Sequence, residues 1–191
     1  MLSEKRIKEI FQETGVMQEG HFLLTSGRHS GSYLQCARLF QYPDLSELLC
    51  IELANKFGKD KVDIVIGPAV GGIIISYEMG RILGARAMFA ERESGIMTLR
   101  RGFTIPENSN VLIVEDVITT GSSVKEVMEL VHDMGARLAG VGVMIDRTGG
   151  NVDLGVKMES VITLELPSYS PEECPFCKKN QPLEKPGSRN L

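Results

Sequence analysis

Long apolar runs, excess positive charge and cysteine are all scarce in this 191-residue chain. No apolar run approaches the roughly 20 residues that a membrane-spanning helix needs, so we expect no membrane partner. The formal net charge of −4 disfavours a general affinity for nucleic acid. The charged, amphipathic start lacks the apolar region of a secretion signal, and we therefore expect a cytoplasmic protein.

The few cysteines exclude a disulfide framework, because they are scattered along the chain at positions 36, 50, 174 and 177. The spacing Cys174-x-x-Cys177 is half of a zinc site, but a structural zinc ion needs four ligands. His21, His29 and His132 are far apart in the sequence. We therefore expect a turn in the tail with two free thiols, and a zinc site shared across a dimer is the alternative.

The patterning favours an α/β fold with a central, mostly parallel sheet flanked by helices. Continuous apolar segments alternate with helical patterns, as parallel sheets covered on both faces require. The expected strands are 62–66, 85–90, 111–115 and 137–146, and the expected helices between them are 73–84 and 124–135.

Several segments lie outside this alternation. We expect a first helix capped by Ser3, a strand–turn–strand unit in residues 20–40 and a helix over 44–58. The segment 91–110 is long and polar, and loops of this length in compact domains are usually functional or mobile. The tail, 174–191, is rich in proline and lysine and is expected on the surface.

Residues 111–123 suggest a ligand site. The strand 111–115 delivers Glu115 and Asp116 to the sheet edge where α/β proteins bind ligands. The small hydroxylated loop that follows opens a helix, and Ser123 with Glu126 has the spacing of a capping box. Backbone N–H groups at a helix start suit a phosphate, whereas paired carboxylates suit vicinal hydroxyls or a hydrated Mg²⁺.

A sugar phosphate with free hydroxyls satisfies both halves of this site. Neither G-x-x-x-x-G-K-[ST] nor G-x-G-x-x-G occurs in the chain, which disfavours nucleoside triphosphates and dinucleotides. The alternative is that the acids end a strand and the loop merely turns the chain. Either half alone favours that alternative, but the complete series favours a function.

The stretch VLIVEDVITTGSS (111–123) resembles the phosphoribosyl-pyrophosphate (PRPP) motif of type I phosphoribosyltransferases. The resemblance implies that fold, and it places Glu115 and Asp116 at the ribose hydroxyls and Thr119 to Ser123 around the 5-phosphate. It also implies Mg²⁺ held through the substrate, with Asp116 as a catalytic residue and the candidate protein ligand. The implied PRPP-binding residues are Glu115, Asp116, Val117, Ile118, Thr119, Thr120, Gly121, Ser122 and Ser123, and the implied pyrophosphate loop contains Ala69, Val70 and Gly71.

Two other stretches resemble orotate phosphoribosyltransferases. LLTSGRHSGSYLQ (23–35) is similar to their N-terminal hood over the base, and MIDRTGG (144–150) to a strand that ends in Asp-Arg. The guanidinium of Arg147 matches the carboxylate of orotate, and Thr119 is implied beside it. A surface ion pair of Arg147 with Asp146 or Glu165 is the alternative.

The resemblance covers nearly the whole chain and implies one phosphoribosyltransferase domain over residues 1–191. Within it we expect a hood segment at 1–40, a PRPP-binding core at 60–147 and the surface tail. FAERESGIMTLRRGF (89–103) stands where the family has a mobile catalytic loop that closes over the neighbouring subunit, which implies a homodimer.

Cations in this loop stabilise the departing pyrophosphate in such reactions. Residues 91–106 contain no lysine, although many family members have one there, and Thr25 stands where some members have another. The candidate cations are therefore Arg92, Arg100 and Arg101. A solvated charged loop is the alternative for each of them taken singly.

We therefore expect a Mg²⁺-dependent enzyme that transfers ribose 5-phosphate from PRPP to orotate. The products would be orotidine 5-phosphate and pyrophosphate, in de novo UMP synthesis. The alternatives are a phosphoribosyltransferase for another base, such as xanthine or adenine, and a non-catalytic relative that senses PRPP.

Overall fold

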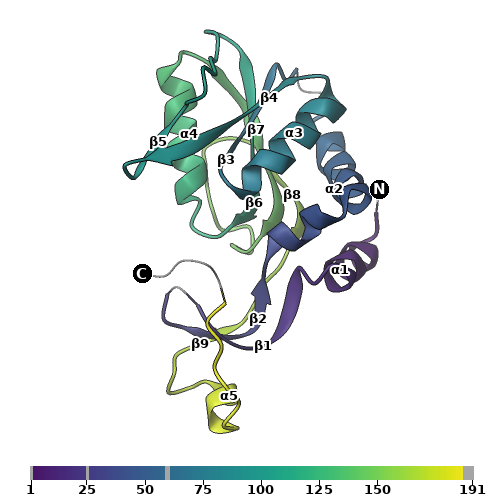
Figure 1. The fold of residues 1–191 in the computed structure, drawn as a ribbon, viewed down its shortest axis with the longest axis vertical. Helices are drawn as coiled ribbons and strands as arrows, with labels where there is room; N and C mark the ends of the chain where they lie inside the picture. The colour runs from purple at the N-terminus through teal and green to yellow at the C-terminus, as the bar shows by residue number, and fades with distance from the viewer. Residues whose placement is uncertain (1, 25, 59–60, 187–191) are drawn as a thin grey trace.

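The computed structural model describes residues 2–24, 26–58 and 61–186, and Thr25 lies outside this part of the chain (Figure 1). Its main element is a six-stranded sheet in the order β5-β4-β3-β6-β7-β8. Every neighbouring pair is parallel except β4 and β5, which are antiparallel. The expected mostly parallel sheet is confirmed. Its strands are β3 (Ile64–Pro68), β4 (Arg86–Glu93), β5 (Ile96–Thr98), β6 (Asn110–Ile118), β7 (Arg137–Asp146) and β8 (Met158–Thr163).

Helices cover both faces of this sheet, as the apolar strands require. One face packs against α1 (Glu4–Glu13), α2 (Pro43–Asn55) and α3 (Gly71–Leu83), and its core includes Val65 and Leu112. The other face packs against α4 (Ser122–Asp133) and includes Ile66 and Ile113. Neighbouring residues of one strand point to opposite faces, so each strand contributes to both cores.

A second, smaller sheet has the order β1-β2-β9 and lies beside the main sheet (Figure 1). The antiparallel strands β1 (Met17–Leu23) and β2 (His29–Leu34) confirm the expected strand–turn–strand unit, and β9 (Ser168–Tyr169) joins them from the C-terminal part of the chain. We call this sheet the hood. It continues through a short 3-10 helix, η1 (Cys36–Gln41), into α2.

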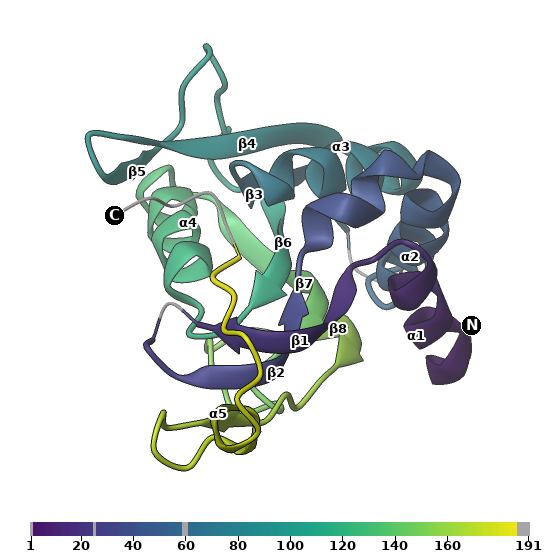
Figure 2. The ribbon, with the colours of Figure 1, turned by 60° about the horizontal axis from the view of Figure 1, so that its bottom comes forward.

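The C-terminal tail crosses the hood and contains the short helix α5 (Pro175–Lys178) (Figure 2). The backbone N–H of Glu184 donates to the carbonyl of His21, and the N–H of Leu23 donates to the carbonyl of Glu184, both at 2.8 Å. The tail is therefore hydrogen-bonded to β1 as far as Glu184. Its last residues, 187–191, lie outside the described part.

Three expectations need correction. β6 runs on to Ile118 rather than ending at Glu115, because its pairing with β7 continues to Ile118↔Asp146. The segment 91–110 is not simply a long loop, since β4 extends to Glu93 and β5 folds back on it. The four residues of α5 were not expected. Ser3 does cap α1, with its hydroxyl accepting from the Arg6 N–H at 3.2 Å.

Candidate active site at the carboxyl ends of the strands

The candidate site lies where β3, β6 and β7 end, the edge at which open α/β sheets bind ligands. The parallel register places Ile118 of β6 beside Asp146 of β7. Figure 2 shows the C-terminal end of β6 directed toward the hood hairpin. No helix in the described residues is long and apolar enough to cross a membrane.

The two adjacent carboxyl groups differ in environment. Glu115 is buried, and burial followed by the nearby charge of Asp116 raises the pKa of the Glu115 carboxyl to about 9. The Asp116 carboxylate accepts the Val117 N–H at 2.7 Å, and Glu115 accepts the Asp116 N–H at 3.1 Å. In the free protein at neutral pH, Glu115 therefore retains its proton.

The loop between β3 and α3 packs directly against Asp116. A Cβ atom at Gly71 would overlap the Asp116 carboxylate, so only glycine allows this approach. The Ala69 N–H donates to the Ala90 carbonyl at 2.7 Å, the peptide between Ala69 and Val70 is cis, and the Val70 side chain is exposed. The structure thus brings the expected pyrophosphate loop to the expected ribose-binding carboxylate.

The loop after β6 opens α4, but not through the expected capping box. Gly121 is the N-cap residue, with φ = +76°, and no side chain caps the helix. Glu126 instead forms an ion pair with Arg92. The exposed hydroxyl of Thr120 lies 2.8 Å from that of Ser122. The result is still a hydroxyl-rich loop at a helix start, which suits a phosphate dianion.

Arg147 sits at the end of β7, and its backbone N–H donates to the Ile118 carbonyl at 3.0 Å. In the described residues, no carboxylate lies within ion-pair distance of its guanidinium. Asp146 instead accepts the backbone N–H groups of Thr148 and Gly150, at 2.7 and 3.2 Å. Burial lowers the pKa of Arg147, and the neighbouring Tyr33 of the hood partly offsets this. A half-buried guanidinium without a carboxylate partner is available to an anionic ligand.

The three candidate loop arginines are held by acids in the free chain. Arg92 pairs with Glu126 of α4 at 2.6 Å, Arg101 binds Glu91 at 2.9 and 3.1 Å, and Arg100 lies 3.2 Å from Glu93. Their partners belong to the β4–β5 hairpin and α4 rather than to the carboxylate pair. The structure therefore does not bring them together with Asp116.

One neighbour of the site was missed in the sequence. The buried Cys36 thiol, at the start of η1, donates to the Asp116 carbonyl at 3.8 Å. Burial, and then the charge of Asp116, raises the pKa of this thiol well above its usual value. The thiol therefore stays protonated and links the base of the hood to the carboxylate pair. Its position just after the hood hairpin was the only signal in the sequence.

The carboxylate pair has the chemistry of a magnesium site. Mg²⁺ prefers a few carboxylate oxygens and completes its shell with water and substrate oxygens. Asp116 offers a carboxylate oxygen at the carboxyl end of β6, and Glu115 can supply another once it loses its proton. The residues present therefore fit Mg²⁺ held mainly through a substrate.

Comparison with known proteins identifies the family. The model of the phosphoribosyl transferase domain family matches residues 44–158. Over 190 residues the chain is 59% identical to the orotate phosphoribosyltransferase of Pelotomaculum thermopropionicum, covering 100% of both proteins. The Thermotoga maritima enzyme of that name is 55% identical over 185 residues, which are 97% of this chain and 99% of the relative. The chain belongs to the orotate phosphoribosyltransferase family.

Solved structures agree with membership of this family. The orotate phosphoribosyltransferase of Aeropyrum pernix superposes with a TM-score of 0.72 at 25% identity, covering 83% of this chain and 94% of that one. An adenine phosphoribosyltransferase from Thermoanaerobacter pseudethanolicus has a TM-score of 0.62 at 15% identity over 70% of this chain and 88% of that one. The latter likeness shows the fold alone, which phosphoribosyltransferases of different base specificity share.

The fold expected from the PRPP motif is thus confirmed as that of an orotate phosphoribosyltransferase. The family model spans α2 to the start of β8 and so contains the carboxylate pair, the pyrophosphate loop and Arg147. The hood hairpin and the tail lie outside it. The full-length relatives, by contrast, match over the hood and the tail as well.

Proposed function

We propose that this protein transfers ribose 5-phosphate from PRPP to orotate, forming orotidine 5-phosphate and releasing pyrophosphate in de novo UMP synthesis. The bond from C1 of the ribose to the pyrophosphate oxygen breaks, and a bond from C1 to N1 of orotate forms. The observation that carries the proposal is the Gly71–Asp116 contact. It joins a pyrophosphate loop to a ribose-binding carboxylate beside a phosphate-binding helix start.

Each part of PRPP has a matching surface at this edge. The backbone and hydroxyl groups of Thr119 to Ser123 bind the 5-phosphate, with Val117 and Ile118 leading into that loop. Glu115 and Asp116 bind the ribose hydroxyls, and Glu115 can accept one through its carbonyl oxygen while it keeps the proton that burial retains on it. Ala69, Val70 and Gly71 contact the pyrophosphate through their backbone. Binding and orientation by these groups supply much of the rate.

Mg²⁺ bound to the substrate neutralises charge on the leaving pyrophosphate. Asp116 would hold that ion, and its contact with the pyrophosphate loop at Gly71 supports this role. Additional cations come from Arg92, Arg100 and Arg101. Their ion pairs are exposed and such pairs contribute only about 0–1 kcal/mol each, so the arginines can exchange their carboxylates for pyrophosphate oxygens at low cost.

Base selection rests on Arg147 and Thr119. The half-buried guanidinium has no carboxylate partner in the described residues, and orotate carries the carboxylate that adenine, xanthine and uracil lack. Tyr33 of the hood contributes to the electrostatic environment of Arg147, which supports a base position between hood and sheet.

A panel of bases tests this proposal. The purified protein is incubated with PRPP, Mg²⁺ and one of orotate, uracil, adenine or xanthine, and the nucleotide product is separated by chromatography. We expect orotidine 5-phosphate from orotate and at most trace product from the others. Preferential use of a purine would show that the base assignment is wrong. PRPP binding without product from any base would instead support a PRPP sensor.

We also propose a homodimer in which the β4–β5 hairpin serves the partner's site. Mixed dimers made from two inactive variants, Asp116→Asn and Arg101→Ala, provide the test. If the hairpin acts across the interface, one of the two sites in each mixed dimer is intact, and activity returns to about one quarter of that of the unaltered dimer in a random mixture. If each hairpin instead acts within its own subunit, every site of a mixed dimer carries one of the two defects. Mixing would then restore no activity beyond that of the separate variants.

A further inference from the structure

Four side chains of metal-binding type meet where the C-terminal tail packs against the hood. They are His21 of β1, His29 of β2, and Cys174 and Cys177 at the start and within α5, and their ligand atoms all lie within 4.8 Å of one another. His21, His29 and Cys174 are buried, and Cys177 is half-buried. The expected two free thiols are present in the tail, and the hood hairpin also folds both histidines against them.

The spacing of these atoms is close to that of a tetrahedral zinc site. His21 Nε2 lies 2.9 Å from His29 Nδ1, 3.4 Å from Cys174 Sγ and 3.6 Å from Cys177 Sγ, and the last atom lies 3.2 Å from His29 Nδ1. Zn–N bonds of about 2.0 Å and Zn–S bonds of about 2.3 Å at tetrahedral angles separate ligand atoms by roughly 3.3–3.8 Å. Four of the six distances between ligand atoms therefore lie within about half an ångström of the values for a zinc site, and the other two do not exceed 4.8 Å.

The orientation of His21 points to the same conclusion. Its Nδ1 lies 2.9 Å from the carbonyl oxygen of Gln181, so Nδ1 carries the hydrogen in the neutral ring and Nε2 presents a lone pair. Three groups converge on that single lone pair, which cannot accept a hydrogen from all of them. A cation at the centre satisfies all four ligand atoms at once. A backbone carbonyl that fixes the outer nitrogen of a metal-binding histidine is a common feature of such sites.

The chemistry of the four ligands selects the metal. Two thiolates and two imidazoles in a tetrahedral arrangement favour zinc over the hard cations Mg²⁺ and Ca²⁺, which prefer oxygen. Two thiolates also neutralise the charge of the ion, so the site can be buried without a further carboxylate. Four protein ligands leave no open position, which is typical of structural rather than catalytic zinc.

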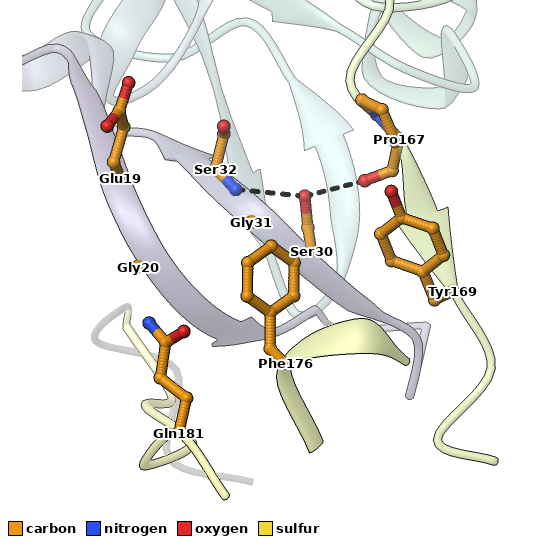
Figure 3. A pocket seen from close by; sticks show the side chains of 9 residues that line it. All are labelled: Glu19, Gly20, Ser30, Gly31, Ser32, Pro167, Tyr169, Phe176 and Gln181. Carbon is orange, nitrogen blue, oxygen red and sulfur yellow. Dashed lines mark hydrogen bonds between the residues drawn. The ribbon is translucent and has the colours of Figure 1, made fainter. Parts of the chain in front are cut away.

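We propose that His21, His29, Cys174 and Cys177 bind one Zn²⁺ ion that fastens the C-terminal tail to the hood. Figure 3 shows how the tail lies on the hood there: Phe176 and Gln181 from the tail line a pocket together with Ser30 and Gly31 of β2. The Phe176 ring also stacks on His21, with centroids 5.6 Å apart. The ion joins residues more than 140 positions apart in the chain and so holds the tail against the hood.

Metal content provides the first test. The full-length protein is purified under reducing conditions without chelators or a histidine tag, desalted, and analysed by plasma mass spectrometry. We expect about one zinc ion per chain. Cys177→Ser and the double variant Cys174→Ser/Cys177→Ser should lose most of it. His132→Gln and Cys50→Ala, which alter the same residue types outside the cluster, should retain it.

A second measurement keeps the proposal testable if those variants fold poorly. The unaltered protein is stripped of metal with a chelator, its fold is checked by circular dichroism, and it is titrated with Co²⁺. We expect the intense visible bands of tetrahedral Co²⁺ with thiolate ligands, saturating at about one equivalent and abolished by Zn²⁺. Chelation should also expose the tail to carboxypeptidase and lower the melting temperature, and zinc should restore both.

Three outcomes would overturn the proposal. The first is a zinc-free protein whose reduced thiols bind zinc no more tightly than the double variant does. The second is a Cys174–Cys177 disulfide in protein isolated without oxidant, shown by intact mass with and without reductant. The third is retention of the full zinc content by the double variant. None of these outcomes depends on transfer to orotate, so failure of the zinc site and failure of the proposed reaction are distinguishable.

Discussion

Gly71 at the start of α3 packs against the carboxylate of Asp116, leaving no room for a side chain between the two loops. A methyl group at position 71 must displace either the carboxylate or the backbone of the pyrophosphate loop. A displacement of about 1 Å in a positioned group can reduce a rate about 10²-fold. A substitution at position 71 therefore tests the site directly.

We therefore predict that Gly71→Ala lowers kcat/KM for PRPP by about 10²-fold while the protein remains folded. The measurement is steady-state kinetics together with circular dichroism and a thermal melt. Gly58→Ala is the matched control, because a Cβ there makes only an ordinary contact, 3.6 Å from the nearest atom. Equal kinetics for Gly71→Ala and Gly58→Ala would show that the contact has no functional importance.

Arg147→Ala should raise the KM for orotate about 10- to 100-fold, since a hydrogen bond to a charged group contributes about 1.5–3 kcal/mol. The KM for PRPP should change much less. The control is Arg137→Ala, an exposed arginine that donates to Asn108. If both substrates were affected equally by Arg147→Ala, the guanidinium would have a structural role rather than a role in selecting the base.

The buried carboxyl of Glu115 should make stability depend on pH. Its pKa of about 9 in the folded protein lies above the unfolded value of about 4.3. Between these values the folded protein holds a proton that the unfolded chain has lost. This contribution to stability is complete below about pH 4 and disappears as the pH rises through about 9.

We expect Glu115→Gln, which cannot ionise, to become progressively more stable relative to the unaltered protein as the pH rises from 5 to 9. Melting temperatures of both proteins without ligand provide the measurement, and Glu129→Gln on the exposed face of α4 is the control. If the melting temperatures of Glu115→Gln and the unaltered protein changed equally with pH across this range, the protonated state of Glu115 would be contradicted.

The first part of this site could be predicted from sequence because it is contiguous. Residues 111–123 form one strand, one loop and one helix start, and their order alone suggested a phosphate beside a diol. The start of α4 was predicted for the wrong reason, since glycine in a left-handed conformation begins it and Glu126 has a different partner. Local patterns cannot reveal that partner, because Arg92 lies on another element.

Long-range contacts account for the remaining failures. β6 extends beyond Glu115 and Asp116 because β7 pairs with it. The register between two strands cannot be predicted from the sequence of either strand alone. The histidine–cysteine cluster was missed for the same reason, since His21 and Cys174 are 153 positions apart. The half-site Cys174-x-x-Cys177 was visible in the sequence, but the histidines that complete it lie on a hairpin that the tail reaches only in the folded protein.

Substitutions can distinguish a role of the loop arginines in the reaction from a role in their ion pairs. Arg101→Ala should lower kcat by about 10²-fold with little change in KM, as expected for a group that stabilises the departing pyrophosphate. Glu91→Gln breaks the same ion pair but keeps the arginine, and should leave kcat within about threefold because exposed pairs contribute little. Equal losses in the two variants would assign Arg101 a role only in holding the hairpin.

The most direct test of the central claim is the loss of orotate absorbance over time with enzyme, PRPP and Mg²⁺, repeated with excess EDTA and with Asp116→Asn. We predict a loss that needs PRPP, stops with EDTA, returns when Mg²⁺ is restored, and is reduced by about 10² in the variant. An unchanged absorbance with folded protein that binds PRPP would contradict transfer to orotate. A full rate with Asp116→Asn would contradict the placement of the site at the end of β6.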